Sequence, residues 1–295
     1  MRRRVAATML AAALAAGLTL LTAPGAAASG KATVLTASLS GAREVPGPGD
    51  PDGRGRAAVK LAGGKACFLL EWSQISAPTA AHIHTGRAGV AGPVAVLFFQ
   101  PGANAASLPD TLDAVAGCVD VERDLARKIA ASPRDYYVNI HNADFPDGAI
   151  RGQLRRAGHL DLDLPHQLTA RLSGANEVPP ADPDGRGLAF VRVGRERVCF
   201  AVGWTDITPP IFAHIHAGVA GVNGPVVVLF FDVPELAAGP PAELPATISA
   251  AAGCVEDQDR AVLRDIRRQP RAHYVNVHNS EFPGGAIRGQ LRRVA

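Results

Sequence analysis

Two pairs of histidines are the residues of this 295-residue sequence with the clearest capacity for chemistry. One isoleucine separates His82 from His84, and one separates His214 from His216. Residues i and i+2 of a β-strand point to the same face, so the two imidazoles of each pair should face the same side of a sheet. Neutral imidazole is a common metal ligand, and each pair therefore predicts part of a metal site.

A third histidine follows each pair at a distance, in a strand-like run that also carries an asparagine on the same face. These are His141 with Asn139, and His278 with Asn276. Three imidazoles with an open fourth position suit zinc or copper, and such binding should weaken in acid as the imidazoles take up protons. The predicted ligands are His82, His84 and His141 for one site, and His214, His216 and His278 for the other.

The alternative is that these histidines are structural. A histidine on a half-buried strand can hydrogen-bond to the backbone and remain inert. All six nevertheless recur between two halves of the chain whose neighbouring residues have changed: Tyr136, for example, aligns with His273. His159, His166 and His273 have no counterpart and are not included in either site.

The whole chain contains one module twice. The sequence AHIH at 81–84 returns at 213–216, and YVNIHN at 137–142 returns as YVNVHN at 274–279. The offset changes little, so we expect a first domain over residues 33–156 and a second over 166–293. The linker, residues 157–165, is short and partly alternating, which favours two domains held close together.

Within each copy the signals are mostly those of strands. Short runs of aliphatic and aromatic residues are separated by Gly- and Pro-rich turns. The fold class is therefore mainly β, with two tandem antiparallel β-sandwich or barrel domains. Residues 94–99 and 226–231 are apolar on both alternating faces, which predicts strands buried on both sides. Helical spacing before Pro133 and before Pro270 predicts one covering helix in each copy.

Residues 1–28 have the pattern of a secretory signal peptide: three arginines, an apolar stretch and an A-x-A cleavage site. After its removal the chain would carry 27 basic and 27 acidic residues. This balance argues against a nucleic-acid-binding protein. No second apolar run reaches the roughly 18 residues of a membrane span, so we expect no membrane anchor after cleavage.

Each copy holds two cysteines, and the repeat favours a disulfide within each copy, Cys67 with Cys118 and Cys199 with Cys254. Export permits such bonds. The alternative, a redox or metal-binding thiol pair, lacks support because no C-x-x-C occurs. The segments at 50–53 and 182–185 (DPDG) predict turns rather than calcium loops, since too few oxygen ligands follow.

One ion pair per copy is a further expectation. Glu44 could pair with Arg151, and Glu177 with Arg288, as structural ties. We find no sequence motif of a catalytic nucleophile or of a phosphate-binding loop.

Several long segments resemble the CHRD domain, which is named after chordin. They are AHIHAGVAGVNGPVV at 213–227, YVNVH at 274–278, IRGQL at 287–291 and LSGANEVPP at 172–180, with counterparts in the first copy. The resemblance implies an extracellular β-rich module whose biochemical role is poorly defined. The chain departs from the family pattern at Ala149 and Ala286, where a glutamate is common, and at Asn142 and Asn279, where a threonine is usual.

The sequence thus favours a secreted tandem CHRD protein that acts as a non-catalytic extracellular binding or structural module. Its partner would be an unidentified extracellular ligand or protein. The alternative is a metal-binding protein or metalloenzyme that holds zinc or copper at one three-histidine site per domain.

Overall fold

A computed structural model of the chain describes residues 32–102, 104–157, 167–236 and 241–294. The predicted signal peptide, residues 1–28, lies outside the described residues. So does most of the predicted linker, including its alternating segment.

Strands dominate both copies. In the first copy the elements are β1 (Thr33–Ser40), β2 (Arg54–Ala62), β3 (Lys65–Ser73), β4 (Pro78–Thr85), β5 (Val94–Phe99), β6 (Leu112–Asp120), α2 (Arg123–Ala131), β7 (Tyr136–Asn142), β8 (Ile150–Gln153) and β9 (Arg155–Arg156). Short 3-10 turns, Gly41–Arg43 and Pro133–Asp135, follow β1 and α2.

The second copy repeats this order. Its elements are β10 (Leu168–Ser173), β11 (Arg186–Val193), β12 (Val198–Thr205), β13 (Pro210–Ala217), β14 (Val226–Asp232), β15 (Ile248–Val255), α3 (Arg260–Arg268), β16 (His273–Asn279), β17 (Ile287–Gln290) and β18 (Arg292–Arg293). The 3-10 turns recur as Gly174–Asn176 and Pro270–Ala272. The mainly antiparallel β prediction is confirmed.

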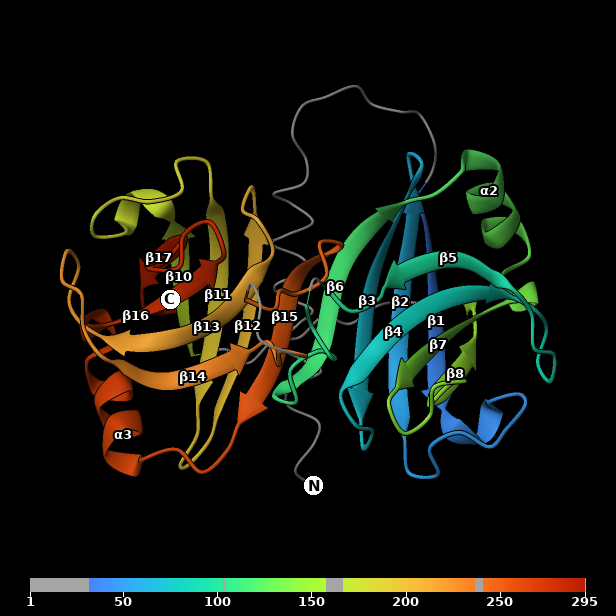
Figure 1. Ribbon diagram of the computed structural model, residues 1–295, viewed down its shortest axis with the longest axis horizontal. Helices are drawn as coiled ribbons and strands as arrows, with labels where there is room; N and C mark the ends of the chain where they lie inside the picture. The colour runs from blue at the N-terminus through green and yellow to red at the C-terminus, as the bar shows by residue number, and fades with distance from the viewer. Residues whose placement is uncertain (1–31, 103, 158–166, 237–240, 295) are drawn as a thin grey trace.

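Each copy places two groups of strands against each other. In the first copy β1, β2, β3 and β6 pair in that order, and β5, β4, β7 and β8 form the second group, which crosses in front of the first in Figure 1. Pairing of β1 with β8 and β9 joins the groups at one side. Alternate side chains of both groups point inward, and Phe68 of β3 meets Phe98 of β5 with ring centroids 4.7 Å apart.

One helix covers each copy, as predicted. Ile129 of α2, and Leu263 and Ile266 of α3, are fully buried against the core. Asp259 begins α3 by accepting hydrogen bonds from the backbone amides of Ala261 and Val262, which satisfies donors that a helix start leaves unpaired.

The prediction that residues 94–99 and 226–231 are buried on both sides is wrong. Val94 and Leu97 of β5 are 52% and 41% exposed, and Val226 and Leu229 of β14 are 49% and 47% exposed. The reason is the position of these strands. Among the described strands, β5 pairs only with β4, and β14 only with β13, so each lies at the border of its strand group. One face of the group packs on the core, and the other is turned away from it.

The two copies are joined by a shared sheet, as expected for domains held close. β6 pairs antiparallel with β15, so that β3, β6, β15 and β12 run side by side across the centre of the molecule (Figure 1). The pairing is made by small residues, among them Ala114, Ala116, Ala250 and Ala252.

Two disulfide bonds link neighbouring strands on either side of this junction. Cys67 of β3 pairs with Cys118 of β6 at an S–S distance of 2.12 Å, and Cys199 of β12 pairs with Cys254 of β15 at the same distance. The pairing within each copy is the one that the repeat predicts. The two DPDG segments are turns, in which the Asp50 or Asp182 carboxylate accepts hydrogen bonds from backbone amides two and three residues on.

Candidate metal centres

The histidines lie on the outer face of the second strand group. In β4, Ile83 points into the core and is fully buried, so His82 and His84 point away from it. In β7, Ile140 is buried in the same way, and His141 takes the opposite face. The antiparallel register places His141 opposite Ala80, two pairs along from His82, which lies opposite Asn139.

The structure brings together the three predicted histidines of each copy. Their candidate ligand nitrogens all lie within 4.8 Å of one another, in the first copy and in the second. Each nitrogen therefore lies within roughly 2.8 Å of a common point, close to the zinc–nitrogen bond length of about 2.0–2.1 Å. Small side-chain movements would bring three ligands onto one ion.

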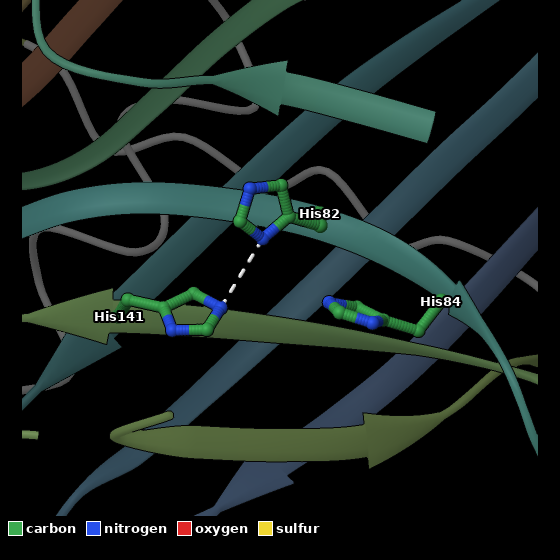
Figure 2. Close-up of side chains that lie close together, drawn as sticks. All are labelled: His82, His84 and His141. Atoms are coloured by element: carbon green, nitrogen blue, oxygen red, sulfur yellow. Dashed lines mark hydrogen bonds between the residues drawn. The ribbon is translucent and has the colours of Figure 1, made fainter. Parts of the chain in front are cut away.

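In the first copy the three rings face one another across β4 and β7 (Figure 2). His82 Nδ1 is 3.1 Å from His141 Nε2, a hydrogen bond in which one imidazole donates to the other. The Asn139 side-chain amide lies 3.0 Å from the same His141 nitrogen and, with its NH2 group turned toward the ring, donates to the lone pair there. The His84 Nε2 atom is buried and has no hydrogen-bond partner.

Backbone carbonyls determine which nitrogen is free to bind. His84 Nδ1 donates to Gly92 O at 2.8 Å, and His141 Nδ1 donates to Pro146 O at 2.9 Å. A carbonyl only accepts, so the proton of each ring is on Nδ1 and the lone pair is on Nε2. Such contacts orient metal-binding histidines and set their tautomer.

The second copy shows the same arrangement with fewer competing contacts. His216 Nδ1 donates to Gly224 O at 2.7 Å, and His278 Nδ1 donates to Pro283 O at 3.0 Å. The three remaining nitrogens, His214 Nδ1, His216 Nε2 and His278 Nε2, are all buried without a hydrogen-bond partner. Buried polar atoms are rarely left unpaired, so three at one point need an explanation.

Burial also keeps the imidazoles neutral. Loss of hydration lowers the pKa of His82 to about 4, with the neighbouring histidines adding to the effect. Burial likewise lowers the pKa of His214 to about 3 and that of His278 to about 4. The pKa values of His84, His141 and His216 move in the same direction for the same main reason. Neutral imidazole is the form that binds metal.

A stack of rings supports each site, which the sequence analysis missed. The His84 ring lies on the Tyr137 ring, 4.9 Å between centroids, and the Arg151 guanidinium carbon lies 3.3 Å from the centre of the same tyrosine. In the second copy His216, Tyr274 and Arg288 repeat these contacts at 4.7 and 4.6 Å. The alternation of β7 offered a signal, because Tyr137, Asn139 and His141 share one face.

The predicted ion pair is formed in the second copy, where Arg288 Nε is 3.9 Å from Glu177 Oε2 and both side chains are buried. In the first copy the charge of Arg151 lowers the pKa of Glu44, but no direct ion pair joins the two residues. Burial still raises the pKa of each glutamate to about 7. Gly148, at φ +141°, makes room for Glu44, since a Cβ there would lie 2.6 Å from the carboxyl carbon.

The arginines also hold the loop that carries the carbonyl anchor of His84 or His216. Arg151 Nη2 donates to Val90 O at 2.7 Å. Arg288 Nη1 donates instead to the Asn223 side chain at 2.7 Å, where the first copy has Ala91. The glutamate, arginine and tyrosine of each copy therefore position one histidine indirectly.

The sequence profile of the CHRD domain matches residues 35–154 and again residues 168–291. The chain belongs to the CHRD domain family. Both matched segments contain a complete set of the three histidines, the tyrosine and the arginine. No curated protein matches the chain at a significant level. Among the described residues, no helix has the length and apolar character needed to cross a membrane.

Proposed function

We propose that this tandem CHRD protein is a secreted metal-binding module that holds one zinc or copper ion in each copy. His82, His84 and His141 form the first site, and His214, His216 and His278 form the second. The observation that carries the proposal is the convergence, in the second copy, of three buried and unpartnered imidazole nitrogens within 4.8 Å of one another.

The chemistry of the donors selects the ion. Three neutral imidazoles suit zinc and copper, whereas calcium and magnesium prefer oxygen ligands. Four of the six rings are oriented by backbone carbonyls, at His84, His141, His216 and His278. Such preorganised rings lose little freedom on binding an ion, which favours affinity.

Two features support a location outside the cell. Each copy has a cysteine pair at disulfide distance, and disulfides persist in oxidising compartments. The signal-peptide pattern of residues 1–28 agrees with export. We propose metal binding and no catalysis, in agreement with the non-catalytic module that the sequence favours.

Elemental analysis tests the proposal directly. Protein lacking residues 1–28 is purified without chelator, dialysed against equimolar zinc and copper, and analysed for bound metal. We expect two ions per chain, one in each of the variants His84→Ala and His216→Ala, and none in the double variant. Two ions retained by the double variant, or none bound by the wild-type protein near pH 7, would refute the proposal.

His273 provides a matched control. It is buried in β16, but its Nδ1 contacts Gln269 O and its Nε2 lies 3.5 Å from an Asp265 oxygen. The first copy has Tyr136 at the equivalent position, so His273→Tyr installs a residue that this fold already accepts. This variant should bind two ions.

A further inference from the structure

The two sites differ in one residue beside the cluster. Phe212 of β13 lies opposite His278 in the register, and the equivalent position of β4, opposite His141, is Ala80. The Phe212 ring packs on two of the three ligand rings, with centroids 4.4 Å from His278 and 5.3 Å from His214. No such ring lies beside the first cluster among the described residues of β4.

Solvent access to the clusters differs accordingly. His82, His84 and His141 are all half-buried, whereas His214 and His278 are only 6% and 5% exposed. The two strands that carry the ligands pair in the same register in both copies. The lower exposure in the second copy coincides with the change from Ala80 to Phe212, whose ring packs on the two buried imidazoles.

Resting on the proposed function, we propose that the two centres have different roles toward small molecules. The metal in the first copy keeps a coordination position open to a small exogenous ligand, such as water or a monodentate anion. Phe212 shields the same position in the second copy, which makes that centre closed. Three protein ligands leave a coordination position that an exogenous ligand can take, so a side chain that covers this position should limit ligand exchange.

Asp147 is the side chain of the first copy that could itself occupy the open coordination position. It is exposed and lies six residues after His141, and its charge offsets part of the lowering of the pKa of that histidine by burial. The second copy has Gly284 at the equivalent position. The Asp147 oxygens are not part of the cluster of ligand atoms within 4.8 Å. The proposal therefore leaves the first centre open with Asp147 present.

Azide titration of the copper-loaded protein tests the proposal. Copper content is measured first, so that failure to bind two ions counts against the proposed function and not against this inference. Azide bound to Cu²⁺ gives a charge-transfer absorption that reports an open position. In the wild-type protein we expect one azide per two coppers, with the second centre binding at least about tenfold more weakly.

Exchanging the two residues provides matched variants. Phe212→Ala should raise the stoichiometry to two azides, and Ala80→Phe should abolish the strong site while copper content stays at two. His84→Ala and His216→Ala then assign the signal, which should vanish only in the first. If Ala80→Phe does not fold, the azide stoichiometry of Phe212→Ala alone tests whether Phe212 shields the second centre.

Three results would overturn the inference. They are equal azide affinity at both centres of the wild-type protein, no gain of azide binding in Phe212→Ala, and azide binding that appears in the first centre only after Asp147→Asn. The last would show that Asp147 fills the fourth position.

Discussion

His216 Nδ1 lies 2.7 Å from the carbonyl oxygen of Gly224, and His84 repeats this contact with Gly92 at 2.8 Å. Both glycines lie in loops that the arginine of the same copy helps to hold. The contact fixes each ring with its proton on Nδ1 and its lone pair toward the cluster. The tautomer that the proposed metal site requires is thus already present in the metal-free protein.

This arrangement predicts the tautomers of the metal-free protein. Nitrogen-15 NMR at pH 7 should show His84, His141, His216 and His278 protonated on Nδ1. Zinc should leave these four unchanged, since each would bind through Nε2. His82 and His214, whose Nδ1 atoms face the cluster, should carry their proton on Nε2 once zinc is bound. Nε2-protonated rings at His84 or His216 in the metal-free protein would contradict the prediction.

Acid should destabilise the metal-free protein through the same histidines. Burial lowers their folded-state pKa values, so the folded protein binds fewer protons than the unfolded chain below about pH 6.5. The stability they contribute is complete above that pH. It is lost as the pH falls toward about 3 for His214 and about 4 for His278, at up to about 1.4 kcal/mol per pH unit for each group.

Urea denaturation between pH 7 and pH 4 measures this loss. His214→Gln removes one titrating group and should give a flatter profile of stability against pH than the wild-type protein. Parallel profiles for wild type and His214→Gln would show that His214 is not shifted as described. Zinc should move the onset of destabilisation to lower pH, because bound imidazoles resist protonation.

The buried glutamates should have the opposite effect. Burial raises the pKa of Glu177 to about 7, from about 4.5 in the unfolded chain. The stability linked to its proton is present below pH 4.5 and is lost as the pH rises through 7. Glu177→Gln should therefore gain stability relative to wild type between pH 5 and pH 8. A difference that stays constant across this range, measured by thermal unfolding of the metal-free proteins, would exclude the shift.

Much of this architecture follows from the sequence by simple rules. The i, i+2 rule places His82 and His84 on one face, and the repeat pairs the cysteines within each copy. The third histidine joins them because β7 lies beside β4, a neighbour relation that the sequence suggests only through the strand-like run around His141.

Other features depend on neighbours that no local pattern specifies. Alternation at residues 94–99 shows that both faces are apolar, but the place of β5 at the border of its group decides that Leu97 is exposed. The anchors of His84 and His141 are carbonyls of Gly92 and Pro146, and a backbone carbonyl has no signature in the sequence. The alanines that join β6 to β15 likewise resemble any small buried residues.

The disulfides should stabilise each copy separately. Replacing Cys67 and Cys118 by alanine opens a loop with a sequence separation of 51, for which the chain-entropy relation gives a loss of about 4 kcal/mol. The Cys199→Ala/Cys254→Ala variant should lose a similar amount in the second copy. Urea denaturation under non-reducing conditions measures both. An unchanged midpoint for either variant would show that the link adds no stability.

The junction between the copies offers a final prediction, based on two symmetric glycines. A Cβ at Gly117 of β6 would lie 1.8 Å from the Thr247 carbonyl oxygen, and a Cβ at Gly253 of β15 would lie 1.8 Å from that of Thr111. Backbone cannot yield as a flexible side chain does, so Gly117→Ala should force β6 and β15 apart at a cost of about 1–3 kcal/mol. Gly284→Ala is the control, because a Cβ there meets no atom within 4 Å.

Hydrogen exchange locates the effect of Gly117→Ala. Amides of β6 and β15 that face each other across the junction should lose protection, while those of β4, β7, β13 and β16 should keep it. Both proposed metal sites should then still bind zinc or copper, because the histidines of each site come from strands within one copy. Unchanged protection of β6 and β15, or loss of metal from both centres, would show that the junction and the centres are not independent in this way.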